Sequence, residues 1–231
     1  MSRVEEAKLK AALEAVKEVR NGFVVGLGSG TTAAYAIQAL GKALRQGSLK
    51  EIRGVPTSHQ AASLARESGL PLVTLDEYPK IDIAIDGADQ VDDTLNLIKG
   101  GGGALMREKV VAAASDRYVI VVDEAKLTDT LGRDQAVPVE ILPFATSFVI
   151  RRLKERARAV NLRTGAGKAS PTITDNGNFL VDATFGLIED VRSLEAWVRT
   201  IPGVLETGLF LDLADAVYVG AEEGVRTMLR Q

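Results

Sequence analysis

Residues 23–33 read Phe-Val-Val-Gly-Leu-Gly-Ser-Gly-Thr-Thr-Ala, an apolar run that passes through three glycines into a helix-forming stretch. Residues 23–27 predict a short strand and residues 32–44 predict a helix. A glycine-rich turn between a strand and a helix gathers backbone amides at the positive end of the helix, where a phosphate can bind. The stretch therefore predicts an α/β fold with a candidate phosphate site at its first turn.

This glycine loop fits two nucleotide-binding patterns poorly. The Walker pattern fails because no Lys-Ser or Lys-Thr pair follows the glycines. Gly28-x-Gly30-x-x-Ala33 matches a dinucleotide pattern, but the next predicted strand ends in Val55-Pro56-Thr57, without the acidic residue expected to bind ribose. A small phosphorylated ligand therefore fits better than NAD, and a ligand-free turn with a threonine cap is the alternative.

Strands and helices alternate along the first half of the chain. Leu9, Leu13 and Val16 recur at helical spacing and predict an opening helix that ends at Asn21-Gly22. Further strands are predicted at 52–55, 72–75, 81–85 and 118–122, with helices at 59–67, capped by Thr57 or Ser58, and at 104–114. Uninterrupted apolar strands between helices are typical of a mainly parallel sheet that is covered on both faces.

The pattern changes after Val122, where the residues predict a smaller α+β unit. Its expected elements are strands at 137–141, near Val160 and at 179–181, helices at 147–157 and 193–200, and a turn at 174–178. Apolar runs at 209–213 and 216–219 predict strands that return to the first sheet. We therefore expect one domain made of residues 1–130 and 204–231, with a smaller domain, residues 131–203, inserted in it.

The composition is that of a globular protein, with 46% hydrophobic and 26% charged residues and a formal net charge of -3. This charge gives no electrostatic support for binding nucleic acid or an anionic membrane. No window approaches about 18 consecutive apolar residues, and the charged N-terminal stretch lacks a signal core, so we expect a cytoplasmic protein without membrane spans. With no cysteine and one histidine, His59, thiolate chemistry is excluded, and Ser-His-Asp catalysis and multi-histidine metal sites are difficult to build.

Two acidic residues follow the predicted strand at 81–85 in the segment Asp86-Gly87-Ala88-Asp89. Their carboxylates therefore lie at the carboxyl end of a parallel strand, where ligand sites of α/β proteins form. The alternative is an Asp-rich turn that caps its own amides.

Residues 99–109 read Lys-Gly-Gly-Gly-Gly-Ala-Leu-Met-Arg-Glu-Lys, and four successive glycines favour a backbone that approaches a ligand closely. Glu108 falls about one and a half turns into the following helix and can face the same cavity. The alternative is that residues 107–109 are a solvated helix face. Lys126 follows the strand at 118–122, where it either contacts a ligand or is an ordinary surface lysine.

Together, the loop at 26–33, Asp86-Gly87-Ala88-Asp89, the 99–109 segment and Asp123-Glu124-Ala125-Lys126 resemble, in this order, the motifs of type A ribose-5-phosphate isomerases. Asp175-Asn176-Gly177-Asn178 and Ile201-Pro202-Gly203-Val204 are also similar to that family, so the resemblance runs through almost the whole chain. One departure is Gly103, where family members commonly have alanine.

The resemblance implies an aldose–ketose isomerase that interconverts D-ribose 5-phosphate and D-ribulose 5-phosphate in the non-oxidative pentose phosphate pathway, without a cofactor. Because the chain has one histidine and no cysteine, we also expect the reaction to need no metal. The resemblance also implies a Rossmann-like domain, a smaller ferredoxin-like α+β domain, and assembly into a homodimer or homotetramer. By position, Glu108 matches the family's general base. The substrate contacts match Ser29, Gly30, Thr31, Thr32, Asp86, Gly87, Ala88, Asp89, Lys99, Gly100, Gly101, Gly102 and Lys126.

The reaction can also be considered from its chemistry. A carboxylate can move a proton between C1 and C2 of a sugar through a cis-enediolate, provided that donors stabilise the charge that develops on oxygen. Glu108 suits this proton transfer. The remaining candidate roles are hydroxyl proton transfer and ring opening for Asp86 or Asp89, stabilisation of the oxyanion for Lys99 and the glycine amides, and phosphate binding for the 29–32 loop with Lys8 or Lys126.

Two other classes of protein remain open. A non-catalytic sugar-phosphate sensor would need a DNA-binding module, but the first strand begins at Phe23 and the chain is not basic. A transferase could use Glu108 as a covalent nucleophile on thioesters, and acyl-enzyme formation with coenzyme A donors would reveal it.

Overall fold

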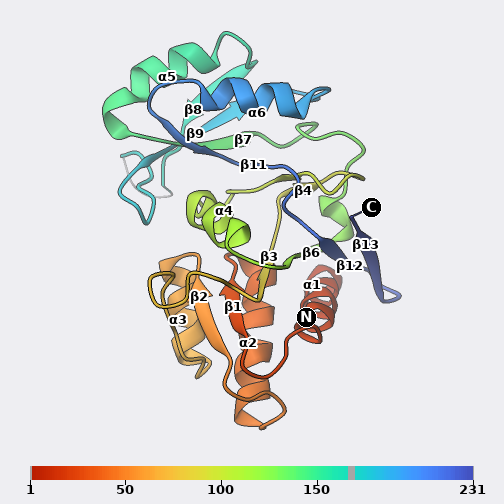
Figure 1. Ribbon diagram of the computed structural model, residues 1–231. Coiled ribbons are helices and arrows are strands. Elements are labelled where there is room, and N and C mark those ends of the chain that lie inside the picture. Colours follow the sequence, from red (N-terminus) through yellow and green to blue (C-terminus); the bar gives the residue numbers. More distant parts are fainter. Residues whose placement is uncertain (1, 166–169, 231) are drawn as a thin grey trace. The chain divides into compact units, whose positions relative to one another are not determined.

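The computed structural model describes residues 2–165 and 170–230 and divides into two compact units (Figure 1). The large unit contains the chain up to Ala88, Arg107–Leu127 and the chain from Asp212 onward, whereas the small unit contains Asp89–Met106 and Thr128–Leu211. These boundaries differ from the expected ones, since residues 89–106, 128–130 and 204–211 belong to the small unit. Strand pairing is the reason, because 204–207 and 209–210 pair with strands of that unit.

The large unit is built on a six-stranded sheet in the order β13-β12-β6-β3-β1-β2. Neighbouring strands are parallel except for β12 and β13, which are antiparallel. The mainly parallel sheet and the return of the chain to it near residue 216 are therefore confirmed. The strands are β1 (Val24–Leu27), β2 (Arg53–Pro56), β3 (Ile83–Asp86), β6 (Tyr118–Asp123), β12 (Ala216–Gly220) and β13 (Val225–Leu229).

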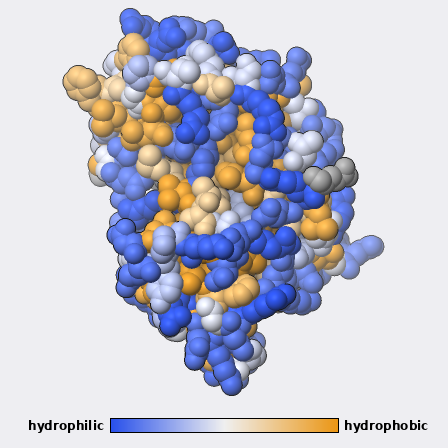
Figure 2. Space-filling model, in the orientation of Figure 1, coloured by the Kyte–Doolittle hydropathy of each residue, from blue (hydrophilic) through white to orange (hydrophobic). Residues whose placement is uncertain are grey.

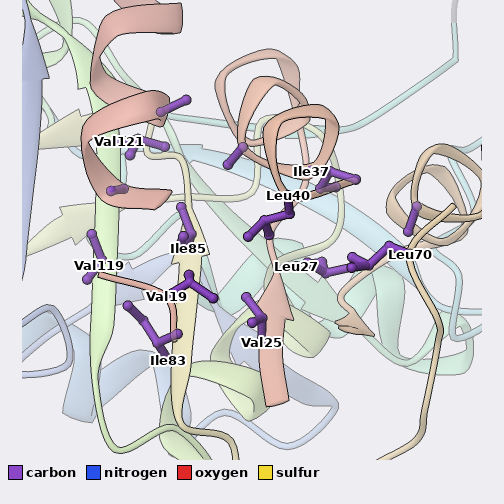
Figure 3. Packing of buried hydrophobic residues seen from close by; sticks show 14 of the residues in the cluster. Val19, Val25, Leu27, Ile37, Leu40, Leu70, Ile83, Ile85, Val119 and Val121 are labelled. Carbon is purple, nitrogen blue, oxygen red and sulfur yellow. The ribbon is translucent and has the colours of Figure 1, made fainter. Parts of the chain in front are cut away.

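Helices cover both faces of this sheet. Alternate strand residues such as Val25, Ile85 and Val121 pack against α1 (Arg3–Val16), α2 (Thr31–Arg45) and α3 (His59–Glu67) in one apolar cluster (Figure 3). The intervening residues face the other way, toward α4 (Leu105–Ala113), because a Cβ on Gly26 would lie 2.6 Å from a methyl group of Val111. Strand alternation therefore places Asp86 and Tyr118 on the α4 face of the sheet.

Some predictions for this unit are wrong in detail. The helix α1 ends at Val16 rather than at Asn21, because the amides of residues 17–19 bond three residues back and tighten the last turn. Its buried face is made of alanines, whereas Leu13 is exposed. The strand expected at 72–75 is a single bridge from Leu72 to Gly54, since a turn closed by Glu77 and Thr74 follows at once.

The small unit contains a four-stranded antiparallel sheet in the order β10-β7-β9-β8. Its element order, strand-helix-strand-strand-helix-strand, is that of a ferredoxin-like fold, as the resemblance implied. The helix α5 ends earlier than predicted, and the strand β10 was not predicted. The elements are β7 (Val137–Ile141), η2 (Pro143–Ala145), α5 (Thr146–Leu153), β8 (Ala159–Leu162), β9 (Phe179–Thr184), α6 (Val191–Arg199) and β10 (Val204–Thr207).

A buried carboxylate organises the turn that precedes β9. Oε1 of Glu140 accepts hydrogen bonds from the Thr174 hydroxyl at 2.9 Å and from the side-chain amides of Asn176 at 3.0 Å and Asn178 at 2.8 Å. Glu140 is fully buried in β7. The Asp175–Asn178 motif therefore owes its two asparagines to the fold of the small unit.

A second, three-stranded sheet of the small unit has the order β11-β5-β4, with β4 (Gln90–Val91), β5 (Leu97–Ile98) and β11 (Leu209–Phe210). The apolar run at 209–213 thus pairs with β5, and the prediction that it joins the first sheet is wrong. None of the helices within residues 2–165 and 170–230 is long and apolar enough to cross a membrane.

Candidate active site

Asp86 is the last residue of β3 and is 1% exposed. Its Oδ1 accepts hydrogen bonds from the backbone amides of Ser29 at 3.1 Å and Gly87 at 2.8 Å, and its Oδ2 accepts one from the Tyr118 hydroxyl at 3.2 Å. These contacts join the carboxyl ends of β1 and β3 to the first residue of β6. The carboxylate therefore has a fixed orientation at the carboxyl edge of the parallel sheet, where the sequence placed it.

The first two glycines of the loop make room for this carboxylate and for α4. A Cβ on Gly28 would overlap Oδ1 of Asp86, and a Cβ on Gly26 would lie 2.6 Å from the Ala84 side chain. Gly30 differs, because a Cβ there meets open space among the described residues but its φ of 94° is unfavourable for other residues. Gly26 and Gly28 are therefore packing glycines, and Gly30 is the glycine of the turn.

The residues after Gly30 form the N-terminus of α2. Gly30 is the N-cap residue and supplies no side chain, so within residues 2–165 and 170–230 the first turn of α2, with Thr31 and Thr32, has no side-chain cap and its amides can bind an external acceptor. The ammonium of Lys8 donates to the Thr31 hydroxyl at 3.2 Å and to Glu5 at 3.0 Å. A helix N-terminus beside an ammonium group is a favourable environment for an anion.

Ser29 extends this loop toward the end of β2. Its hydroxyl lies 2.8 Å from the Thr57 hydroxyl and donates to the Ser58 hydroxyl at 2.6 Å. Ser58 also caps α3 through the Ala61 amide, which decides between the two predicted caps. The sequence indicated Thr57 and Ser58 as caps only, and their contact with Ser29 was not predicted.

Tyr118 and Glu108 complete a buried group on the α4 face of the sheet. Both side chains are buried, and Glu108 lies in the first turn of α4. The pKa of Tyr118 is raised well above 10.0, first by burial and then by the nearby carboxylates of Asp86 and Glu108. Tyr118 therefore keeps its proton at neutral pH and acts as a donor to Asp86. Tyr118 was predicted only as a strand residue, although a single tyrosine in an otherwise aliphatic run at 118–122 was a signal.

The remaining predicted residues with described contacts lie in the small unit. Oδ2 of Asp89 accepts a hydrogen bond of 2.7 Å from the Gly101 amide, which ties the acidic segment to the glycine run. Gly100 has a φ of 102° and Gly103 a φ of 82°, a backbone conformation that favours glycine at both positions. The ammonium of Lys99 is buried and lies 5.5 Å from the centroid of the Phe210 ring.

Lys126 ends the short helix η1 (Glu124–Lys126) after β6. Within the described residues it makes no hydrogen bond or ion pair with the other predicted site residues. A cavity of about 250 Å³ lies nearby and is lined by Arg3, Val4, Ala7 and residues 123–125 and 220–222, none of which is a predicted site residue. In the described part of the chain, no three acidic or histidine side chains are grouped as metal ligands would be.

Comparison with known proteins identifies the family to which the chain belongs. The family model described as ribose 5-phosphate isomerase A (phosphoriboisomerase A) matches residues 53–224. The chain belongs to the ribose-5-phosphate isomerase A family. It is therefore an aldose–ketose isomerase.

Similar members of the ribose-5-phosphate isomerase A family cover nearly the whole chain. The one from Thermococcus kodakarensis is 48% identical over 227 residues, covering 98% of this chain and 99% of the relative. The one from Thermosynechococcus vestitus is 50% identical over 217 residues, covering 94% and 92%. The isomerase of Methanocaldococcus jannaschii superimposes with a TM-score of 0.93 at 47% identity, over 97% of this chain and 99% of the other.

A further ribose-5-phosphate isomerase, solved in complex with phospho-erythronic acid, superimposes with a TM-score of 0.96 at 46% identity over 100% of both chains. The family model begins after the loop at residues 29–32 but includes Asp86, Lys99 and Glu108. The full-length relatives cover nearly the whole chain, so the family assignment does not rest on the region of the family model alone.

Proposed function

We propose that this chain interconverts D-ribose 5-phosphate and D-ribulose 5-phosphate through a cis-enediolate, in the non-oxidative pentose phosphate pathway of the cytoplasm. The observation that carries this proposal is the buried group formed by Asp86, Glu108 and the Tyr118 hydroxyl. The family supplies the substrate, because its members are named for this sugar phosphate. The reaction needs a base, donors to oxygen and an anion site, and each has a candidate.

We assign the transfer of the proton between C1 and C2 to Glu108. Its side chain is 5% exposed, so a proton that it takes from carbon is shielded from water until it is returned. Its position in the first turn of α4 places the carboxylate near the positive end of that helix. Glu108 takes the proton from one carbon, which leaves the enediolate. It then returns this proton, or one exchanged with solvent, to the other carbon.

We assign ring opening and the movement of hydroxyl protons to Asp86 or Asp89. Asp86 has its carboxylate fixed by two amides and by Tyr118. Asp89 is less buried and uses Oδ2 to hold Gly101, which leaves Oδ1 to face a sugar hydroxyl. Only Gly87 and Ala88 separate these two residues along the chain, and the acidic segment resembles a family motif as a whole, which supports assigning the role to this segment.

We assign stabilisation of the enediolate oxygens to Lys99 and to the amides of Gly100, Gly101 and Gly102. The Lys99 ammonium is buried, and a buried cation interacts more strongly with a developing negative charge than an exposed one does. Chain continuity supports joint action with Glu108, because the helix α4 that carries Glu108 begins directly after the glycine run. Gly87 and Ala88, which lie between the two aspartates, are proposed to contact the sugar through their backbone.

We assign the phosphate to residues 29–32. The open amides at the start of α2 and the Lys8 ammonium on Thr31 support this assignment. Of the two lysines considered from the sequence, Lys8 has the direct contact with this loop, and Lys126 is proposed as a more distant contributor.

We also propose that the chain forms a homodimer or homotetramer. Apolar side chains gather at the surface in the region of α5 (Figure 2). Phe144 is 96% exposed, and Leu142, Phe148 and Leu205 are also exposed. Side chains of this kind are commonly covered by a partner. Sedimentation measurements on the wild type and on Phe144→Asp test this, with a shift of the variant toward monomer expected.

The assay that tests the proposed reaction uses the purified chain after treatment with EDTA. We expect conversion of ribose 5-phosphate to ribulose 5-phosphate at a rate within about twofold of the untreated protein, because one carboxylate and fixed donors suffice. Free ribose should have a kcat/KM lower by on the order of 10³, since phosphate binding energy contributes to turnover. Phospho-erythronic acid, which a relative binds, should inhibit competitively as a charged analogue of the enediolate.

Three outcomes would contradict the proposal. Absence of turnover with intact binding of ribose 5-phosphate would favour a sensor. A covalent acyl adduct on Glu108 after incubation with a coenzyme A thioester would favour a transferase. Activity lost in EDTA and restored by a divalent cation would replace the proposed proton transfer with a metal-assisted hydride shift.

A further inference from the structure

Arg163, which follows β8 in the small unit, connects an ion pair to the glycine run. Its Nε donates to Oδ2 of Asp182 at 2.8 Å, and its Nη2 donates to Oδ1 of the same carboxylate. Its Nη1 donates to the carbonyl oxygens of Gly100 at 2.9 Å and Gly101 at 3.1 Å. The side chains of Arg163 and Asp182 are 18% and 27% exposed, so water competes only weakly with these bonds.

The bonds to the two carbonyls fix two successive peptide planes. In a trans peptide the carbonyl and the following amide point in opposite directions, so holding one aims the other. The amide that pairs with the Gly100 carbonyl belongs to Gly101, and Asp89 accepts it at 2.7 Å. This first peptide is therefore held at both ends.

The second peptide joins Gly101 to Gly102. Its carbonyl is held by Arg163, so the Gly102 amide points away from the guanidinium. This orientation has no support from side chains of the run itself, because the run consists of glycines and a chain of glycines samples many backbone conformations. The guanidinium thus adds to the order that the turn bond from the Gly103 amide to the Gly100 carbonyl, at 3.0 Å, gives the run.

We propose that Arg163, oriented by Asp182, is a positioning residue that aims the Gly102 amide at the oxygen on which negative charge develops. This inference rests on the proposed role of the glycine run in isomerisation. A preorganised donor stabilises charge in the transition state without first paying for reorganisation. Arginine is suited to the task, because its planar fork binds the carboxylate with two nitrogens while the third reaches the carbonyls.

The test compares Arg163→Ala with Arg156→Ala. Arg156 lies in the same unit, 4.5 Å from the centroid of the Trp197 ring, and is remote in sequence from the glycine run. For Arg163→Ala we expect kcat to fall by about tenfold to a hundredfold with KM changed less than about threefold, whereas Arg156→Ala keeps its kcat. Guanidinium ion, added well below denaturing concentrations, should restore part of the lost kcat in Arg163→Ala only.

Hydrogen exchange gives a readout that does not depend on activity. Amides of residues 100–103 should exchange faster in Arg163→Ala than in the wild type, while those of β7 should be unchanged. If Arg163→Ala does not fold, Arg163→Lys, which keeps the charge but loses the fork, should give the same pattern in weaker form. A kcat within about twofold of the wild type, or unchanged exchange at 100–103, overturns the inference. An inactive wild type would overturn the proposed function instead, and exchange at 100–103 would still decide whether Arg163 orders the run.

Discussion

The Tyr118 hydroxyl donates a hydrogen bond of 3.2 Å to Oδ2 of Asp86, and both side chains are buried. Because burial and two carboxylates raise the pKa of Tyr118, this donor persists throughout the pH range in which enzymes are assayed. Tyr118→Phe should lower kcat by about tenfold and cost about 1 kcal/mol of unfolding free energy, because one acceptor oxygen of Asp86 loses its partner. Steady-state kinetics and urea unfolding measure the two effects.

Tyr218 offers the matched control for this prediction. Its hydroxyl donates to Oε1 of Glu18 at 2.7 Å in the same unit, and Glu18 is not a predicted site residue. Tyr218→Phe should lose a similar free energy of unfolding and keep its kcat. Equal losses of kcat in the two variants would mean that Tyr118 acts only through stability.

Glu108→Gln should reduce kcat by on the order of 10² to 10⁴, because glutamine keeps the shape of the side chain but cannot accept the carbon proton. Binding of phospho-erythronic acid, measured by calorimetry, should survive. Exchange of solvent deuterium into the sugar should fall together with kcat. A folded variant with kcat within about threefold of the wild type could not be reconciled with Glu108 as the base.

The glycines of the first loop should respond differently to alanine. Gly28→Ala forces a methyl group onto the Asp86 carboxylate, so both stability and kcat should fall strongly. Gly30→Ala meets open space in the described structure but must adopt a φ of 94°, which costs about 1 kcal/mol or more. Thermal unfolding and kinetics of both variants distinguish packing from backbone strain. A Gly28→Ala protein as active as the wild type would mean that the position of Asp86 is unimportant.

Lys8→Met tests the anion site. The Lys8 ammonium lies on Thr31 at the start of α2, so its removal should raise KM for ribose 5-phosphate by about tenfold, equivalent to about 1.4 kcal/mol. Free ribose carries no phosphate, so its kcat/KM should be unchanged. Lys17→Met, which removes an exposed lysine from an ion pair just past the end of α1, is the control. Equal losses with both substrates would exclude a phosphate-specific role.

The pH dependence of stability should reflect Glu18. Burial alone would raise its pKa, but hydrogen bonds from Arg117 and Tyr218 hold the pKa below the ordinary 4.5. A lowered carboxyl pKa contributes stability above 4.5 that is lost as pH falls through the folded-state value. Urea titrations should therefore show Glu18→Gln less stable than the wild type at neutral pH, with the difference shrinking below pH 4.5.

Tyr218, which is hydrogen-bonded to Glu18, should affect the pH dependence of stability at alkaline pH. Its pKa is raised to about 12, first by burial and then by its bond to Glu18, against an ordinary 10.0. The protonated Tyr218 hydroxyl therefore contributes to the free energy of unfolding in full below pH 10.0, and this contribution is lost as pH rises to about 12. Urea unfolding of the wild type and of Tyr218→Phe measures this loss. If the stabilities of the two proteins fell in parallel across that pH range, the prediction would be wrong.

Much of the fold could be predicted because local signals agreed with it. The helix at 59–67 matches the prediction, since Ser58 supplies a cap and the pattern ends cleanly at Gly69. The edge strands β10 and β13 were missed because partly exposed residues interrupt their apolar pattern. The run at 209–213 was placed in the wrong sheet, because an apolar strand does not specify which partner it pairs with.

The candidate site was predictable where its residues sit in glycine-rich or acidic segments at strand ends. Tyr118 and Arg163 were not found, because each acts on a residue that is far away in the sequence. Tyr118 reaches Asp86 across neighbouring strands, and Arg163 reaches Gly100 from another part of the small unit. Contacts of this kind follow from strand order, which a single sequence does not reveal.

The strand order of the large unit affects how the chain folds while it is being translated. β12 lies between β6 and β13, and α1 packs on both β6 and β12, so that a Cβ on Gly220 would overlap the Ala7 carbonyl. While the ribosome is still making the chain, β6 has an open edge and α1 lacks one of its two supporting strands until Ala216–Gly220 emerges. Open strand edges beside apolar helices are sites of aggregation and chaperone binding. A chain that terminates before Ala216 should therefore be degraded rather than accumulate as a weakened enzyme.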